Sequence, residues 1–213
     1  MALLCLIQLH IHIEPGYFVG EILPAAGESA QQRHVAGRKK NGRQPAEDTW
    51  MPDTSPPTGI PRGVQPYFKL HGSSNWRDTQ DLPLYIAGGN KPRLIAQFPA
   101  IKWCHDEFEK QLMKSDTRLL VIGYSFADDH INESIIKAVN ETKKLRFFVI
   151  DPSGHQVVYR ANSSYGESIY DSNTPLDQAF HAGLMGATSR PLFEAINSDD
   201  MVFSSVKKFL QLP

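Results

Sequence analysis

Five residues that can transfer protons or bind a nucleotide stand at or just after the ends of short apolar runs: His71, Gly72, Gly123, Ser125 and Asp151. An imidazole exchanges a proton near neutral pH, so a histidine can act as a general acid or base. Glycine lets a ligand approach the backbone closely, a hydroxyl donates to phosphate oxygens, and a carboxylate accepts from ribose hydroxyls. A nucleotide site with an acid–base group can be built from residues of these types.

Three of these residues also have a structural explanation that needs no ligand. His71 can hydrogen-bond to the backbone at the end of a strand, because an imidazole offers both a donor and an acceptor. Ser125 can cap backbone groups where a strand leads into a helix. Asp151 precedes Pro152, and this pair is typical of an Asx-turn. Both kinds of explanation stay open at this level.

The elements that would position these residues form a strand–helix–strand unit. Continuous apolar runs at Leu119–Ile122 and Phe147–Ile150 predict strands buried on both faces, as in a parallel sheet. Between them, a helix is predicted from His130 to about Glu141, and Asp128 or Asp129 is expected to cap it rather than to act as a catalytic acid. Its buried stripe should comprise Ile131, Ile135, Ile136 and Val139. Such a unit gathers its ligands at the carboxyl ends of the strands.

Weaker patterns outline the rest of the fold. Tyr67–Leu70 predicts a short strand, and the spacing of Cys104, Phe108 and Leu112 predicts a helix from Cys104 to about Lys114. A further helix is predicted at Met201–Leu210, whereas residues 160–190 give little signal. The fold class is therefore α/β, with a Rossmann-like parallel sheet.

Composition divides the chain into three parts. Residues 1–23 are apolar at the start and are read as a short strand or a disordered beginning, without the charges of a signal peptide. Residues 24–65 are rich in proline and glycine and too poor in apolar residues to form a core, so a disordered linker is expected. Residues 66–213 form the predicted α/β domain.

Charge and cysteine content narrow the classes of partner. The chain has 22 Lys+Arg against 23 Asp+Glu, which favours neither nucleic acid nor a membrane surface. Cys5 and Cys104 are its two cysteines, so a structural zinc ribbon lacks ligands and a cytoplasmic protein with reduced thiols is expected. No metal is expected either, since His105 and His130 are read as surface or packing residues. The oligomeric state stays open.

Two segments of the chain suggest a family. They are Lys-Leu-His-Gly-Ser-Ser-Asn-Trp at 69–76, and Gly-Tyr-Ser-Phe-Ala-Asp-Asp-His-Ile-Asn at 123–132 followed by Val-Ile-Asp-Pro at 149–152. In this order, on a strand–helix–strand frame, they resemble the C-terminal half of the sirtuin-like domains of bacterial antiphage-defence proteins. The resemblance covers residues 66–155 and extends more weakly to the C-terminus.

The resemblance implies a role for each candidate residue. His71 would lie beside the nicotinamide ribose of NAD and act in cleavage of the glycosidic bond. Gly72, Gly123 and Ser125 would line the phosphates and that ribose, while Asp151 would face the adenosine ribose. NAD or ADP-ribose is accordingly the expected ligand.

The chain also departs from the family pattern. A Gly-Ala-Gly phosphate loop and an Asn-Tyr-Asp segment with a catalytic Asn are expected but do not occur in the sequence. Gly16, Gly20 and Gly27 are not arranged as such a loop, and Asn41 stands in a basic segment. The expectation is therefore a truncated relative of the NAD-cleaving defence proteins, weakly active or inactive. The alternatives are a non-catalytic module that binds a nucleotide or a protein and, less favoured, an NAD-dependent lysine deacylase.

Overall fold

The computed structural model describes residues 2–3, 52, 68–142, 144–157, 174–195 and 201–211. The chain divides into two compact units, Met1–Ile11 with Glu109–Pro213 and His12–Phe108. Apart from residue 52, the predicted linker 24–65 lies outside the described residues, and so do most of the segment 1–23 and the predicted boundaries near 23 and 65. Those boundaries and the disorder expected of the linker stay predictions.

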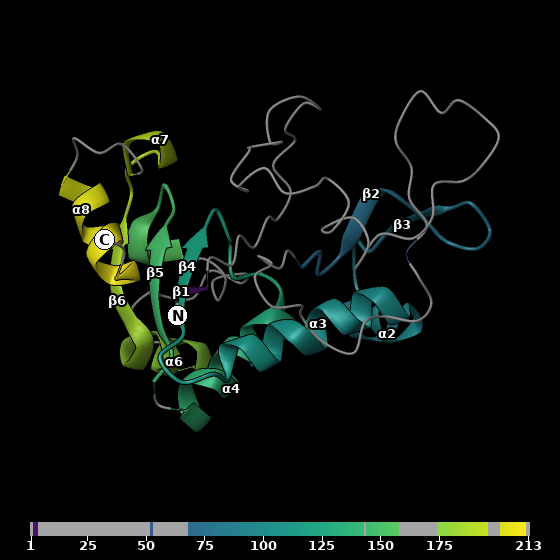
Figure 1. Ribbon diagram of the computed structural model, residues 1–213, viewed down its shortest axis with the longest axis horizontal. Coiled ribbons are helices and arrows are strands. Elements are labelled where there is room, and N and C mark those ends of the chain that lie inside the picture. The colour runs from purple at the N-terminus through teal and green to yellow at the C-terminus, as the bar shows by residue number, and fades with distance from the viewer. Residues whose placement is uncertain are drawn as a thin grey trace, which may run out of the picture. The chain divides into compact units, whose positions relative to one another are not determined.

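The first unit is built on a parallel four-stranded sheet (Figure 1). In spatial order its strands are β1 (Ala2–Leu3), β4 (Arg118–Ile122), β5 (Arg146–Ile150) and β6 (Leu184–Thr188). Leu119 pairs with Phe147 and Ile122 with Ile150, so the two apolar runs lie in parallel register. The α/β class and the adjacent parallel strands predicted from the sequence are confirmed.

Two helices pack against one face of this sheet. They are α4 (Asp129–Thr142) and α6 (Pro175–Gly183). The Phe180 ring of α6 meets the Phe147 ring of β5 edge-on, at 4.8 Å between centroids. Gly183 is packed so closely that an added Cβ would lie 2.6 Å from the Phe147 ring and 3.2 Å from a Val139 methyl. The predicted helical stripe is therefore buried, apart from half-buried Ile136.

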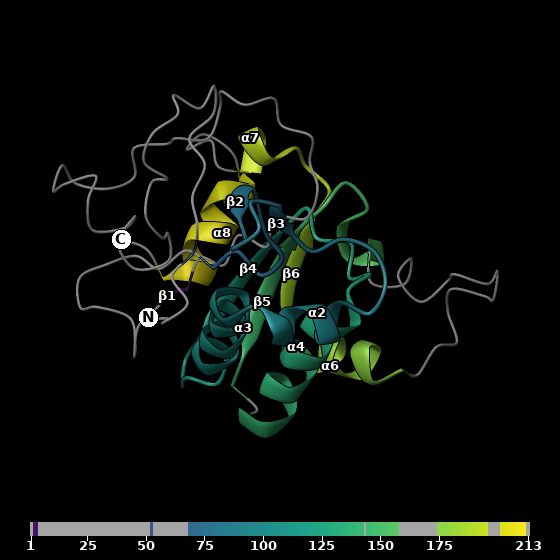
Figure 2. The ribbon, with the colours of Figure 1, turned by 90° about the vertical axis from the view of Figure 1, so that its right-hand side faces the viewer.

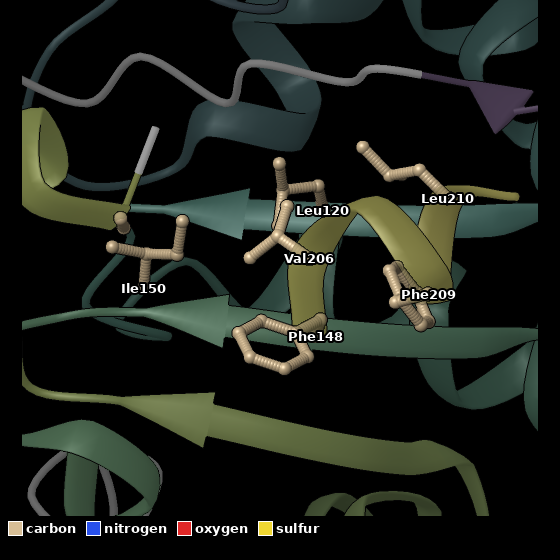
Figure 3. Close-up of a cluster of buried hydrophobic side chains, with 7 residues drawn as sticks. Leu120, Phe148, Ile150, Val206, Phe209 and Leu210 are labelled. Carbon is tan, nitrogen blue, oxygen red and sulfur yellow. The ribbon is translucent and has the colours of Figure 1, made fainter. Parts of the chain in front are cut away.

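The other face is covered by α8 (Met201–Leu210), as Figure 3 shows. Side chains that alternate along β4 and β5 meet the apolar side of α8 in one cluster, whose labelled members are Leu120, Phe148, Ile150, Val206, Phe209 and Leu210. This alternation gives the sheet two buried faces, which explains why its strands read as continuous apolar runs. The short helix α7 (Leu192–Ala195) and the 3₁₀ turn η1 (Gly154–Gln156) complete the described part of this unit.

The second unit pairs a hairpin with helices. The antiparallel strands β2 (Gly72–Arg77) and β3 (Pro83–Tyr85) are followed by α2 (Lys91–Gln97) and by α3 (Pro99–Leu112), whose last residues belong to the first unit. Figure 2 shows these elements in a second view. The core of this unit joins strands and helices through Trp76, Leu84, Ile86, Ile95 and Ile101.

The prediction of a strand at Tyr67–Leu70 is wrong for residues 68–70, which the structure describes. Phe68 and Lys69 lead into a turn, and the strand begins only at Gly72. The turn closes through a hydrogen bond from the Gly72 N–H to the Lys69 carbonyl, and Gly72 has a φ of 76°. An extended strand cannot run through residues 69–72, because this hydrogen bond closes a turn across them.

Two of the three predicted helices agree with the structure. Met201–Leu210 is confirmed, and α4 begins one residue before the predicted His130. By contrast, α3 begins at Pro99, five residues earlier than predicted, because a proline is favourable in the first turn of a helix. Among the described residues, no helix is long and apolar enough to cross a membrane.

Candidate functional site

His71 lies on the turn that begins the β2–β3 hairpin. Its own carbonyl accepts a hydrogen bond from the Ile86 N–H at 2.9 Å, which ties the turn to the residue after β3. The preceding carbonyl, that of Leu70, is 2.6 Å from Nε2 of His105 on α3. The rings of His71 and His105 lie side by side, with centroids 6.3 Å apart. His71 is therefore carried by a short segment that is bonded on both sides.

Gly72 is required by packing as well as by its backbone angle. A Cβ at this position would lie 2.2 Å from the Leu84 carbonyl oxygen of β3. This distance is far inside van der Waals contact, so glycine is needed for the hairpin to close. The packing of the hairpin therefore explains why a glycine follows His71. The ligand role expected of Gly72 stays a prediction.

A half-buried lysine, Lys69, stabilises the same turn. Nζ of Lys69 donates to Ser73 Oγ at 2.7 Å and lies 5.4 Å from the centroid of the Trp76 ring. Burial lowers the pKa of Lys69, although the neighbouring Cys104 partly opposes that effect. Burial also raises the pKa of Cys104 to about 12, so its free thiol stays protonated at neutral pH and acts as packing.

The loop after β4 presents Ser125 to solvent while its neighbours are buried. Gly123 has a φ of 61°, and its N–H donates to the Ile150 carbonyl at 3.0 Å. Tyr124 and Phe126 point into the core, and the alternation leaves Ser125 exposed. The Gly123 amide is therefore already bonded within the sheet. The contribution of Gly123 to the loop is its positive φ, which a residue with a side chain would adopt only at a cost in free energy.

A buried hydrogen-bond network holds this loop onto α4. The Tyr124 hydroxyl donates to Asn132 Oδ1 at 2.9 Å, and Asn132 Nδ2 donates to the Phe126 carbonyl at 2.8 Å. Burial first, and the nearby charge of Asp128 second, raise the pKa of Tyr124, so it remains a neutral phenol. The Asp128 carbonyl also accepts from the Tyr124 hydroxyl and from the N–H groups of the first turn of α4.

Asp151 directly follows β5, and it lies beside Gly123 because Ile122 and Ile150 are paired in register. Its Oδ1 accepts a hydrogen bond from the Ser153 N–H at 2.8 Å, which is the Asx-turn considered from the sequence. The second oxygen, Oδ2, retains the chemistry needed to accept from a ribose hydroxyl. Asp151 is half-buried, and its backbone N–H continues the sheet by donating to Thr188.

The predicted site residues fall into two groups. Gly123, Ser125 and Asp151 come together at the carboxyl ends of β4 and β5, where open parallel sheets bind ligands. His71 and Gly72 belong to the other compact unit. That all five line one cleft stays a prediction.

The first group fits part of a dinucleotide. An exposed hydroxyl and a half-buried carboxylate stand on adjacent strand ends, and such groups suit ribose and phosphate oxygens. The residues that follow β1, where a parallel sheet would place a further loop at the same edge, lie outside the described part of the chain. The NAD site that the sequence predicts at these strand ends stays a prediction.

Sequence reasoning did not assign roles to four residues that support the candidate site: Lys69, His105, Tyr124 and Asn132. The spacing of Lys69 and Ser73 offered a local clue, since a four-residue turn brings their side chains together. No local pattern could have linked His105 to a carbonyl 35 positions earlier.

Comparison with known families agrees with this fold and these motifs. A family model described as SIR2-like domain matches residues 28–170. The chain therefore belongs to the SIR2-like domain family. The match includes residues 28–65, which are most of the segment 24–65 that composition assigned to a linker. No curated protein and no solved structure matches the chain significantly.

Proposed function

We propose that this chain is a SIR2-like module that binds NAD or ADP-ribose and cleaves NAD slowly, with His71 as its acid–base residue. The family is NAD-related, and the motifs of the sequence supply the residue-level expectation. One observation carries the assignment of His71: the two carbonyls on either side of its Cα are both hydrogen-bonded, to His105 and to Ile86. A group that transfers protons gains most from such fixed geometry.

The proposed reaction is hydrolysis at the nicotinamide–ribose bond. The bond between the ribose C1′ and the nicotinamide nitrogen breaks, and its electron pair leaves with nicotinamide. Water adds to C1′, and His71 accepts the proton that is released in forming ADP-ribose. An imidazole suits this step, because it is largely unprotonated near neutral pH and can return the proton to solvent.

Ser125 and Asp151 would hold the ligand rather than react with it. The Ser125 hydroxyl can donate to a phosphate oxygen, and the Asp151 carboxylate can accept from ribose hydroxyls. Slow turnover is proposed because the sequence has no Gly-Ala-Gly segment to supply backbone donors to the pyrophosphate. Losing that anchor weakens the alignment of the bond with His71, and alignment is a large part of catalysis.

Nicotinamide release from NAD by the purified full chain tests the assignment of His71. We expect slow release by the wild type and a loss of around 10² to 10⁴ in His71→Ala, the range typical of removing an acid–base group. His181→Ala is the matched control, since His181 is an exposed histidine on α6. Equal release by His71→Ala and the wild type would reject the role of His71.

A non-catalytic binding module is the second candidate. It is favoured by the commitment of the Gly123 amide and of Asp151 Oδ1 to bonds within the protein, which leaves fewer groups for aligning a substrate. Binding of ADP-ribose with no nicotinamide release at any enzyme concentration would favour this candidate. Lysine deacylation is a weaker alternative, and release of acyl groups from acetylated peptides in the presence of NAD would support it.

A role in antiphage defence is proposed from the resemblance. A cytoplasmic location is proposed from the cysteine content, the absence of a nucleic-acid partner from the balanced charge, and the absence of a resident metal from the reading of His105 and His130 as surface or packing residues. Metal analysis of the purified protein tests the last of these. The mass of the protein in solution would decide the oligomeric state.

A further inference from the structure

We infer that His105 is a positioning residue for His71, an inference that rests on the proposed function of His71. His105 Nε2 lies 2.6 Å from the Leu70 carbonyl oxygen. A carbonyl oxygen can only accept a hydrogen bond, so Nε2 must carry the hydrogen. His105 therefore donates to the peptide group that directly precedes His71.

This bond fixes one of the two peptide planes that flank the Cα of His71. The plane before it contains the Leu70 carbonyl, which accepts from His105. The plane after it contains the His71 carbonyl and the Gly72 N–H, which bond to Ile86 and Lys69. Because peptide units are rigid, fixing both planes fixes the φ and ψ of His71 and hence the direction of its Cβ.

His105 can act as an anchor because its own backbone is immobilised. It lies on α3 next to Cys104, and the buried face of this helix also includes Ile101 and Phe108. All three of these neighbours are fully buried. A donor on such a helix holds the turn more firmly than a donor on a loop would.

The ring of His105 also lies beside the ring of His71. Its centroid lies 6.3 Å from that of the His71 ring, with the planes inclined by 49°. Ring contact of this kind restricts the rotamers that a neighbouring imidazole can adopt. His105 thus acts on both the backbone and the ring of His71, and a point substitution can remove either effect.

The tautomer of His105 gives a test that does not depend on activity. In the full chain labelled with ¹⁵N-histidine, at a pH where the imidazoles are neutral, we expect His105 to carry its proton on Nε2. The resonances can be assigned by their loss in His105→Gln. A proton on Nδ1 instead would overturn the inference, because the bond to Leu70 could not then exist.

Two substitutions separate the hydrogen bond from the space that the ring fills. His105→Phe keeps a ring and loses the donor, whereas His105→Gln keeps a donor at a similar reach. We expect His105→Phe to lower kcat by roughly 10- to 100-fold with KM nearly unchanged, and His105→Gln to recover most of the loss. Asp106→Asn, an exposed neighbour on α3, is the matched control. Equal turnover by His105→Phe and the wild type, or equal losses in both variants, would overturn the inference.

The backbone amide resonances of His71 keep the inference testable at any level of turnover, because this amide belongs to the peptide group whose carbonyl accepts from His105. His105→Phe should shift the amide ¹⁵N signal of His71, and His105→Gln should leave it nearer to its wild-type position. An unshifted His71 signal in His105→Phe would overturn the inference. If His71→Ala leaves nicotinamide release unchanged, the proposed function fails, while the tautomer and the His71 shift still report on the positioning contact.

Discussion

The hydroxyl of Tyr124 lies 2.9 Å from Oδ1 of Asn132 inside the protein, although the residue after Tyr124, Ser125, is exposed. Tyr124 is fully buried and Asn132 is only 6% exposed. Asn132 also donates to the Phe126 carbonyl, and Phe126 has a φ of 54°, which is unfavourable for an aromatic residue. The Tyr124–Asn132 pair therefore offsets the strain of the loop that presents Ser125.

Removing this pair should destabilise the protein by a measurable amount. In Asn132→Ala the Phe126 carbonyl and the Tyr124 hydroxyl both lose a partner, and we expect a loss of about 1–3 kcal/mol in the free energy of unfolding. Asn140→Ala, on the exposed side of the same helix, should change it by less than about 0.5 kcal/mol. Urea unfolding measures both values. Equal losses in the two variants would show that the network contributes little.

The three glycines around the hairpin allow backbone strain to be separated from steric conflict. Gly72→Ala combines a φ of 76° with a Cβ 2.2 Å from the Leu84 carbonyl. Gly88→Ala has a φ of 81° but nothing within 4 Å, and Gly89→Ala has neither problem. We expect Gly88→Ala to cost about 1–2 kcal/mol, the cost of a left-handed alanine, and Gly72→Ala to cost clearly more. Thermal unfolding that ranks Gly88→Ala as the more destabilising change would contradict the packing assigned to Gly72.

The buried thiol of Cys104 should make stability fall at alkaline pH. Burial raises its pKa in the folded state to about 12 from the ordinary value of 9.0, so the folded state keeps a proton that the unfolded state loses. This contribution is complete below pH 9.0 and is lost as the pH rises toward about 12, by up to roughly 1.4 kcal/mol per pH unit. The lowered pKa of Lys69 acts in the opposite sense, since the unfolded state then binds more protons.

Comparison with Cys104→Ala isolates the thiol from these other groups. With Cys5 replaced by Ser in both proteins, the stability advantage of the Cys104 protein over Cys104→Ala should shrink between pH 8 and pH 10. Unfolding by urea at each pH gives the difference. A constant difference across this range would mean that the thiol does not titrate differently in the folded state.

The central sheet could be predicted because its strands carry the signal themselves. Leu119–Val121 and Phe147–Ile150 are buried, and strands with two buried faces are apolar at every position. Such a run can be recognised without knowledge of the residues that pack against it. The strand β6 is different: half-buried Gly186 has no side chain and fits against the Phe148 ring. Its strand character comes from pairing with β5, which local sequence does not report.

The candidate site was predictable only in part, for a similar reason. The strand ends at Gly123 and Asp151 follow from the apolar runs, and the capping box of Thr174 and Asp177 could have located α6. The contact of His105 with Leu70 joins a helix to a turn far away in sequence. Tertiary packing creates such contacts, so a single sequence contains no periodic trace of them.

The most direct test of the account is a calorimetric titration of the full chain with ADP-ribose. We expect measurable binding that weakens by about 1–3 kcal/mol in Asp151→Asn and in Ser125→Ala, as each loses a hydrogen bond to the ligand. Ser115→Ala, an exposed serine before β4, should bind as the wild type does. No binding by the wild type, or binding that neither substitution at the strand ends changes, would contradict the claim that β4 and β5 present an NAD site.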